Sequence, residues 1–260
     1  MTFPQSSPDR APGPGCFDGR VGFVTGAASG MGRTIALQLA RYGASVALVD
    51  RDSKGLEETA AQITFAGGRA LPVTTDVAKA EQVERAVERT VKTFGGLHLA
   101  VNNAGIAGDA APVGEVDPVD WDATIGINLS GVFYGMRYQI PAMLAAGSGA
   151  IVNVSSVFAD RGQGFRSAYA AAKHGIRGLT RSAALDYAPK NIRINELQPG
   201  VIDTPMHSVD RERVKEFAAR VPATRMGTTH EIAAAVLFLL SDQAAYINGA
   251  HLAVDGGFLA

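Results

Sequence analysis

The sequence predicts an α/β protein built on one doubly wound parallel sheet of about seven strands, with helices on both faces. From Arg20 onward, short apolar and β-branched runs alternate with longer amphipathic runs. Each short run is bounded by Gly, Asn, Asp or Pro, which end strands. Short strands that are apolar throughout and are separated by helices are typical of a parallel sheet covered on both faces.

Six segments have the composition of strands. Each is short, rich in Val, Ile, Leu or Ala, and followed by a helical pattern, so the segments read as successive strand–helix units. They are Val21–Thr25, Ser45–Asp50, Ala70–Thr74, Leu97–Val101, Ala150–Val154 and Ile192–Leu197.

Four helices can be bounded from their capping residues and periodicity. One runs from about Gly30 to Tyr42 and stops at Gly43, a residue type that favours helix C-termini. Another opens at Asp117-Pro118, an N-cap followed by proline at the first helical position, and extends to about Ala146. The remaining two are predicted over Ser167 to Tyr187 and Glu231 to Leu240.

The composition indicates one domain over residues 20–260, preceded by a flexible tail over residues 1–19. The tail is rich in Pro, Gly and Ser and lacks the apolar run of a secretory signal. Hydrophobic residues make up 47% of the 260 residues and charged residues 19%, enough apolar side chains for a large core. Neither an internal repeat nor a second linker interrupts the chain after the tail.

Charge and residue counts argue against several function classes. A net charge of −1 gives no electrostatic footprint for nucleic acid or an anionic membrane. No apolar run approaches the roughly 20 residues that span a bilayer. The single cysteine, Cys16, cannot form an internal disulfide, which suits a cytoplasmic location. The five histidines lack the spacing of metal ligands, so we expect no metal site.

The segment after the first predicted strand has the pattern of a dinucleotide-binding turn. It reads Thr25-Gly26-Ala27-Ala28-Ser29-Gly30-Met31-Gly32 and leads into a helix. Its glycines allow a tight turn, close approach of the backbone to a pyrophosphate and close helix–strand packing, while the helix N-terminus offers N–H groups to the anion. We therefore expect a Rossmann-like fold that binds a dinucleotide through Gly26, Ser29, Gly30, Met31 and Gly32.

Asp50, at the end of the second predicted strand, bears on which dinucleotide binds. A carboxylate there can accept hydrogen bonds from the adenosine ribose hydroxyls. It would repel a 2′-phosphate by roughly 1–4 kcal/mol per charge pair. Ser29 supplies no positive charge for that phosphate, whereas Arg51 could reach it, or could remain a solvated side chain beside Asp52. The sequence favours NAD over NADP.

Further polar residues follow the third and fourth predicted strands. Asp76-Val77 and Asn102-Asn103-Ala104-Gly105 lie at the carboxyl ends of strands, where open α/β sheets bind ligands. Asn-Asn-Ala-Gly is also an ordinary turn sequence, and both interpretations can hold. We expect Asp76, Val77, Asn103, Ala104 and Gly105 to contact the dinucleotide.

Tyr169 and Lys173 are the strongest candidates for chemistry. They are four residues apart on a predicted helix and therefore share a face. A phenol with a pKa near its usual value of about 10 is a poor base at neutral pH, and a neighbouring ammonium would lower that pKa. Ser156 follows the fifth predicted strand, where its hydroxyl could hydrogen-bond a substrate oxygen as charge develops. The adjacent Ser155 faces the other way on an extended chain.

These motifs, taken in order, resemble the short-chain dehydrogenase/reductase family in its single-domain form. The resemblance covers about residues 20–260. It rests on Thr25-to-Gly32, Asp76, Asn102-to-Gly105, Asn128, Ser156, Tyr169, Lys173, Pro199-Gly200 and Asp255-Gly256-Gly257. It implies oxidation of an alcohol or reduction of a ketone with a nicotinamide cofactor, which carries the hydride chemistry.

The resemblance also implies a role for each motif residue. Tyr169 would be the general base or acid, Ser156 would polarise the carbonyl, and Lys173 would bind the nicotinamide ribose and lower the tyrosine pKa. Asn128 would hold a water that links Lys173 to solvent. The segment after the last of the six strands would contact the nicotinamide through Pro199, Gly200, Ile202 and Thr204.

The substrate is less constrained by the sequence. Similarity of several segments to family members that act on cyclic alcohols, diols and ketones favours a cyclic or apolar secondary alcohol, by analogy alone. Phe158 and Met206 are candidates for the pocket wall, beside Ser156 and Tyr169. Apolar residues at helical spacing after Thr204 fit either a lid or an ordinary surface helix; they are Val214, Phe217, Ala218 and Val221.

Two other functions remain open at this point. One is an NADPH-dependent reductase of 3-oxoacyl groups on a carrier protein, which Asp50 disfavours. The other is a nucleotide-binding regulator without catalysis, which the intact Ser156, Tyr169 and Lys173 disfavour. The family resemblance further implies a homotetramer built on the two long helices.

Overall fold

Seven parallel strands form one sheet in the computed structural model, which describes residues 15–205, 216, 218, 219 and 221–260. Their order across the sheet is β3-β2-β1-β4-β5-β6-β7, so the direction of winding reverses between β1 and β4. This confirms the doubly wound parallel sheet. The strands are β1 (Val21–Thr25), β2 (Ser45–Asp50), β3 (Arg69–Thr74), β4 (Leu99–Asn102), β5 (Gly149–Val154), β6 (Ile192–Pro199) and β7 (His251–Val254).

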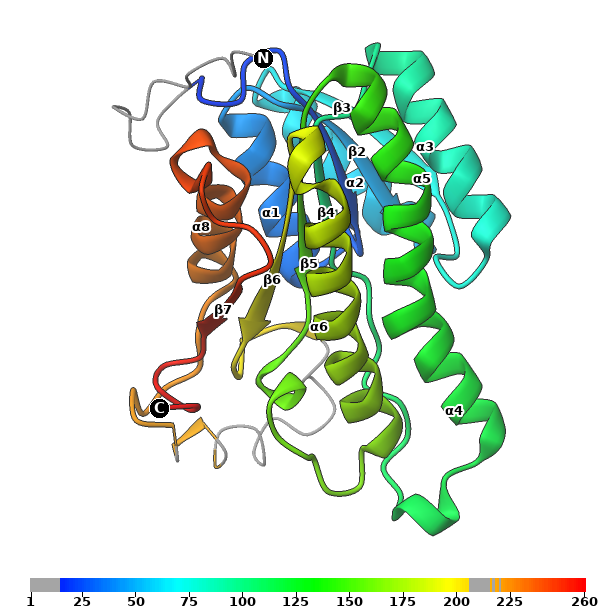
Figure 1. Cartoon of the computed structure of the whole chain (residues 1–260), viewed down its shortest axis with the longest axis vertical. Coiled ribbons are helices and arrows are strands. Elements are labelled where there is room, and N and C mark those ends of the chain that lie inside the picture. The colour runs from blue at the N-terminus through cyan, green and yellow to red at the C-terminus, as the bar shows by residue number, and fades with distance from the viewer. Residues whose placement is uncertain (1–14, 206–215, 217, 220) are drawn as a thin grey trace.

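Helices cover both faces of the sheet, as predicted (Figure 1). Side chains alternate along a strand, so Phe23 and Val24 of β1 enter the cores on opposite faces. One core is completed by α1 (Gly30–Arg41), α2 (Ser53–Phe65) and α8 (Thr229–Leu240). The other is completed by α3 (Ala80–Phe94), α5 (Gly131–Ala146) and α6 (Ser167–Tyr187).

The helix predicted over residues 117–146 is interrupted. Asp117 caps α4 (Pro118–Ile125) by accepting a hydrogen bond of 2.8 Å from the N–H of Val119, as its sequence position predicts. A π-helical turn over Gly126–Ser130 then separates α4 from α5. An extra residue in a helical turn disturbs regular hydrogen bonding and commonly marks a functional position. This turn contains Asn128.

Strand ends differ by a few residues from the prediction, and β7 was not located from the sequence. β6 continues to Pro199 because its last residues pair with β7, for example Pro199 opposite Val254. β7 escapes detection because it is only four residues long and alternates exposed with half-buried positions at the sheet edge. Its residues lack the continuous apolar character of the central strands.

The last five residues of the predicted tail belong to the fold. Phe17 is buried, and its N–H donates to the carbonyl of Tyr42 at 3.0 Å. Residues 1–14 lie outside the described residues, as do Met206, Val214 and Phe217 of the predicted pocket wall and lid. Ala218 and Val221 are described and buried. Within the described residues, no helix is both long and apolar enough to span a membrane.

One side chain joins the strand ends at the point where winding reverses. The hydroxyl of Thr25, at the end of β1, accepts hydrogen bonds from the N–H groups of Asn103 at 2.9 Å and Ala104 at 3.0 Å. The Asn103 amide donates in return to the Thr25 carbonyl at 2.9 Å. The glycine-rich turn after β1 and the turn after β4 are thereby held together.

We expect Thr25→Val to destabilise the protein, because it removes the hydroxyl and leaves two N–H groups without their acceptor. The loss should be about 1–3 kcal/mol in the free energy of unfolding. Urea denaturation followed by circular dichroism measures it. Thr93→Val is the matched control, since the Thr93 hydroxyl bonds only within its own exposed helix turn. Equal losses for the two variants would contradict the bridging role of Thr25.

Candidate active site

A cavity of about 1460 Å³ opens at the carboxyl ends of the strands. Pockets for drug-sized ligands measure about 300–1,000 Å³, so this one has room for a dinucleotide together with a small substrate. Nearly all of the predicted dinucleotide contacts lie on its wall. They are Gly26, Ser29, Gly30, Met31, Asp50, Arg51, Asp76, Val77, Asn103, Ala104, Gly105, Tyr169, Pro199, Gly200, Ile202 and Thr204.

The glycine-rich turn has the shape that a bound pyrophosphate requires. Gly26 adopts φ +70°, and a Cβ there would lie 2.6 Å from the Asn103 amide nitrogen. Gly32 is buried beneath the cavity wall, where a Cβ would lie 2.0 Å from the Gly26 carbonyl oxygen. Gly32 therefore allows the helix to pack against the turn and does not face the cavity. The residues present fit a dinucleotide.

Asp50 is positioned at one end of the cavity by two backbone N–H groups. Ala28 donates to one carboxylate oxygen at 3.2 Å and Asp52 to the other at 3.1 Å. A carboxylate has about four acceptor sites, so these two bonds orient it while leaving acceptors for a ligand. Arg51 lies beside it on the cavity wall and is exposed.

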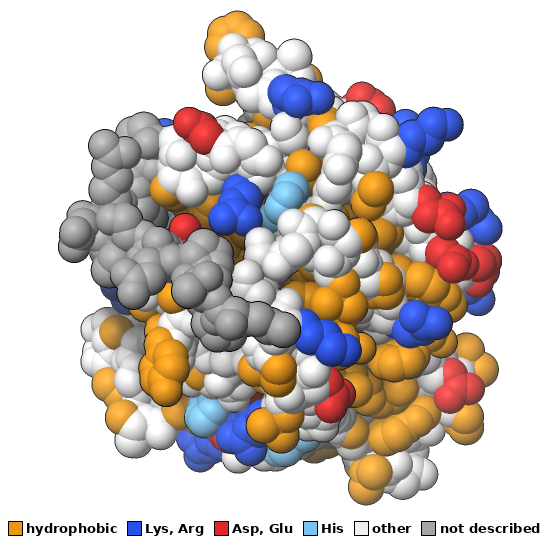
Figure 2. Space-filling model, turned by 45° about the horizontal axis from the view of Figure 1, so that its top comes forward, with side chains coloured by type: hydrophobic (Ala, Val, Ile, Leu, Met, Phe, Trp, Pro, Cys, Tyr) orange, Lys and Arg blue, Asp and Glu red, His pale blue; other side chains and the backbone are white. Residues whose placement is uncertain are grey.

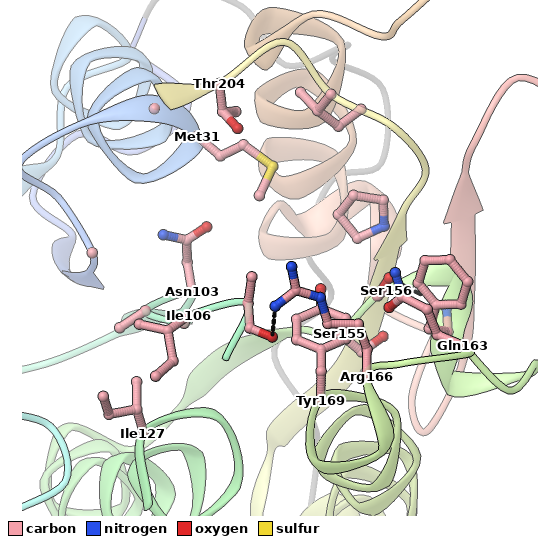
Figure 3. A pocket seen from close by; sticks show the side chains of 18 of the residues that line it. Met31, Asn103, Ile106, Ile127, Ser155, Ser156, Gln163, Arg166, Tyr169 and Thr204 are labelled. Carbon is pink, nitrogen blue, oxygen red and sulfur yellow. Dashed lines mark hydrogen bonds between the residues drawn. The ribbon is translucent and has the colours of Figure 1, made fainter. Parts of the chain in front are cut away.

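The predicted catalytic residues meet at the other end. Ser156 follows β5, and Tyr169 and Lys173 lie on α6. The Ser156 hydroxyl is close enough to Tyr169 to lower the pKa of the phenol. Lys173 Nζ lies 5.4 Å from the centre of the Tyr169 ring and donates to the Val154 carbonyl at 3.1 Å. Figure 3 shows Ser156 and Tyr169 facing the cavity.

Lys173 and Asn128 lie behind the wall instead of on it. Asn128 is fully buried, and its side chain forms two hydrogen bonds of 2.8 Å with the backbone of Ile106. A Cβ on Gly105 would lie 2.9 Å from the Asn128 side-chain oxygen and 3.7 Å from Lys173 Nζ. A glycine at position 105 therefore lets the backbone pass close to both groups.

Burial has the largest effect on the pKa values of Tyr169 and Lys173. It raises the pKa of Tyr169 above its usual value, while the hydrogen bond from Ser156 and the charge of Arg166 lower it in part. Burial also lowers the pKa of Lys173 to about 8, and the nearby Glu196 carboxylate opposes that change. The expected lowering of the tyrosine pKa by Lys173 is not among these effects, and the loss of hydration around the phenol dominates.

The two adjacent serines have different partners. The Ser155 hydroxyl donates to the carboxylate of Glu196 on β6, whereas the Ser156 hydroxyl accepts from the N–H of Phe158 at 3.2 Å. Glu196 is buried and also accepts from Arg177 Nε at 3.1 Å. Arg177 pairs in turn with Asp160, on the loop after β5. Both serines line the cavity, and the Ser155 hydroxyl is the one bonded to a buried carboxylate.

The substrate side of the cavity contains residues that the sequence alone did not single out as site residues. Phe158 lies on the wall as predicted, and its ring meets that of Phe258 edge to face with centroids 6.4 Å apart. Ile106, Gln163, Arg166 and Phe258 also line this side. Arg166 stands three residues before Tyr169, a helical spacing that could have identified it. Within the described residues, no cluster of three His, Cys, Asp or Glu side chains could hold a metal ion.

Comparison with known proteins gives consistent matches over nearly the whole chain. A family model described as enoyl-(acyl carrier protein) reductase matches residues 26–259. Cyclohexanol dehydrogenase from Acinetobacter sp. is 43% identical, with 93% of this chain and 96% of that protein covered. Cis-4-hydroxycyclohexanecarboxylate dehydrogenase from Sinomonas cyclohexanicum is 45% identical, and the match covers 94% of this chain and 98% of that protein.

Comparison with solved structures gives the same kind of match as the sequence comparisons. The crystal structure of levodione reductase superposes with a TM-score of 0.89 at 42% identity, covering 93% of this chain and 98% of that one. Related structures contain NAD in one case and NADP in others, so the comparisons leave the choice of dinucleotide open.

The fold, the site and these relatives together define the class of protein: an oxidoreductase of alcohols or ketones that uses a nicotinamide dinucleotide. More narrowly, the chain belongs to the short-chain dehydrogenase/reductase family.

We expect Glu196→Gln to lower the pKa of Lys173 below about 8, because the substitution removes the carboxylate that opposes the effect of burial. NMR of lysines labelled at Cε, with the Lys173 signal assigned from Lys173→Met, measures this pKa. As a control, Glu231→Gln removes an exposed carboxylate on α8 that does not affect the pKa of Lys173, so this pKa should stay unchanged. An unaltered Lys173 pKa in Glu196→Gln would contradict the electrostatic link.

Proposed function

We propose that this oxidoreductase uses NAD to interconvert a cyclic, largely apolar secondary alcohol and its ketone, with Ser156, Tyr169 and Lys173 as catalytic residues. The observation that carries the proposal is the grouping of Ser156 and Tyr169 on the cavity wall, with the buried Lys173 one helical turn from the tyrosine. Asp50 ends β2 and Ser156 follows β5, and β1 and β4 lie between these two strands, so Asp50 is well separated from this group along the cavity.

Tyr169 exchanges the proton of the reacting oxygen. In oxidation its phenolate accepts the alcohol proton, and in reduction its hydroxyl donates a proton to the forming alkoxide. The Ser156 hydroxyl donates a hydrogen bond to the same oxygen as negative charge develops on it. The nicotinamide ring, when bound, supplies the hydride acceptor or donor.

Lys173 supplies positive charge behind the tyrosine. Its ammonium is oriented by the Val154 carbonyl and lies close to Gly105, where a dinucleotide ribose would pass. At its pKa of about 8, Lys173 is mostly protonated at neutral pH, so it favours the phenolate form of Tyr169 as a base.

Asn128 contributes through the π-helical turn and not through its amide. Both ends of its side chain are already bonded to Ile106. A water that connects Lys173 with solvent would therefore be held by the main chain of the turn Gly126–Ser130. A π-helical turn departs from the regular hydrogen-bond ladder and is frequent at functional sites.

Asp50 supports NAD as the cofactor. Its carboxylate is oriented by Ala28 and Asp52 at the end of the cavity opposite Tyr169. A 2′-phosphate there would meet a fixed negative charge. The same argument disfavours the alternative of an NADPH-dependent 3-oxoacyl carrier-protein reductase. The intact set of Ser156, Tyr169 and Lys173 disfavours a regulator without catalysis.

A cyclic substrate is supported by the relatives and by the cavity wall. The relatives include dehydrogenases of cyclohexanol and of a hydroxycyclohexanecarboxylate. The wall beside Tyr169 presents the apolar side chains of Ile106, Ile127 and Phe158. These can cover the faces of a saturated ring and exclude water from the reacting carbon.

A homotetramer is the proposed assembly, and we place α5 and α6 at its interface. A shallow apolar groove is lined by Phe133 and Tyr134 of α5, Leu179 of α6 and Leu129 of the preceding π-helical turn, and Phe133 is 46% exposed. Figure 2 shows hydrophobic side chains gathered on the right of the molecule, the side that carries α5 in Figure 1. Exposed apolar patches commonly mark protein interfaces.

We expect Tyr169→Phe to lower kcat for cyclohexanol oxidation by about 100- to 10,000-fold, the usual contribution of a general base. Binding of NAD, followed by quenching of the Trp121 fluorescence or by calorimetry, should remain within a few-fold. Tyr246→Phe, at a fully exposed tyrosine, serves as the control. Undiminished activity of Tyr169→Phe would show that the proposed mechanism is wrong.

Asp50→Ser should shift cofactor preference toward NADP. Removing the carboxylate removes the repulsion of a 2′-phosphate, so the ratio of kcat/KM for NADP to that for NAD should rise about 10- to 100-fold. Initial rates with each dinucleotide measure the ratio, and Glu57→Gln, an exposed change on α2, should leave it unaltered. A wild-type enzyme that prefers NADP would overturn the assignment of NAD.

A further inference from the structure

The substrate side of the cavity carries a positive charge for which the proposed function has no use. Arg166 occupies the N-cap position of α6, three residues before Tyr169. Residues three apart on a helix are neighbours, with Cβ atoms about 5–6 Å apart. Figure 3 shows the Arg166 side chain extending past Tyr169 into the cavity, where its charge is close enough to lower the pKa of the tyrosine.

The guanidinium of Arg166 retains most of its hydrogen-bonding capacity. Its one recorded bond is from Nη1 to the carbonyl of Ala107, at 3.2 Å. Within the part of the chain that the structure describes, no carboxylate pairs with it. By contrast, Arg177 is paired with both Asp160 and Glu196. A guanidinium has five N–H donors, so Arg166 can hold a planar anion while keeping its bond to Ala107.

The backbone before Arg166 is held in an uncommon conformation. Phe165 adopts φ +62°, a left-handed geometry that costs a bulky residue of the order of 1–3 kcal/mol. Its carbonyl accepts a hydrogen bond of 3.1 Å from the N–H of Ala111, on the opposite loop. This contact and the bond from Arg166 to Ala107 lie side by side, so two loops together orient the guanidinium.

We propose that Arg166 is a specificity residue that binds an anionic group, a carboxylate in the first instance, on the alcohol or ketone substrate. The proposal rests on the proposed function, since it names the substrate class of that same site. The reacting carbon would lie against Ser156 and Tyr169, and the carboxylate would lie one helical turn away. A carboxylate across a saturated six-membered ring from the carbinol has about this separation.

Compared with the other charged residues on this side of the cavity, Arg166 is the one best placed to bind an anion. Arg161 is exposed, and its guanidinium lies over the Phe258 ring at 5.1 Å from the centroid. Asp160 is occupied by Arg177. Glu216 is a negative group on the wall and is exposed to solvent, which screens it. A substrate anion at Arg166 therefore meets a half-buried cation, where a charge-assisted bidentate contact is strongest.

The test compares three alcohols that share one ring: 4-hydroxycyclohexanecarboxylate, its neutral carboxamide and cyclohexanol. Steady-state rates are measured with saturating NAD for the wild type, Arg166→Gln and Arg166→Lys. For Arg166→Gln, kcat/KM should fall about 10- to 100-fold with the carboxylate and less than about threefold with the carboxamide. Arg166→Lys, which keeps the charge but not the planar fork, should give an intermediate loss.

Arg161→Gln is the matched control, because it removes the same charge from the same loop. It should leave the preference for the carboxylate within about threefold of the wild type. A loss that falls equally on all three substrates, or one that appears in Arg161→Gln in place of Arg166→Gln, would overturn the proposal.

A binding measurement separates this proposal from the proposed function. If the wild type oxidises none of the three alcohols with NAD or NADP, the proposed function fails. Calorimetric titration of the enzyme with the carboxylate and the carboxamide, in the presence of NADH, then tests Arg166 alone. Tighter binding of the carboxylate that Arg166→Gln abolishes would support the subsite, and equal binding of the two compounds would refute it.

Discussion

The site depends first on the contact between the ends of β1 and β4, where the winding of the sheet reverses. Two parallel strands whose connections leave in opposite directions open a crevice at their carboxyl ends. The Thr25 hydroxyl closes the base of this crevice by accepting from the N–H groups of Asn103 and Ala104. The glycine-rich turn and the turn after β4 thus become one surface. The close approach of Gly32 to the Gly26 carbonyl completes it.

A second constraint holds α6, which carries Tyr169 and Lys173, against the sheet. A buried polar network connects Asn102 on β4 with Gln139 on α5 and with Asn153 on β5, and Asn153 continues to Thr180 on α6. Each of these amides is paired inside an apolar core, where an unpaired one would be costly. The network ties both long helices to the strand ends. It resists sliding of α6, which would separate Tyr169 from Ser156.

The sequence predicted the central strands and most of the residues that line the cavity, because both have local signatures. Apolar strands such as β1, the N-cap at Asp117 and the four-residue spacing of Tyr169 and Lys173 can each be recognised within a few residues. β7 is short and lies at an edge, so its pattern is weak. The roles of Glu196 and Arg166 depend on which segments meet in space. The same is true of Asn128, whose amide turns out to be bonded to Ile106.

The pKa of Tyr169 illustrates why spacing alone does not determine chemistry. A lysine four residues away suggests an acidic phenol, yet burial affects both groups and raises the tyrosine pKa while lowering that of Lys173. At neutral pH the phenol therefore holds its proton, which fits its proposed role as proton donor in ketone reduction. In the proposed mechanism oxidation requires the phenolate, which becomes accessible only when positive charge near the ring outweighs the loss of hydration. Glu196 keeps Lys173 charged and so helps to maintain that positive charge. An anion bound at Arg166 would partly neutralise it. In the proposed mechanism, the balance between the two directions of the reaction thus depends on charges that lie around the tyrosine, beyond Ser156, Tyr169 and Lys173 themselves.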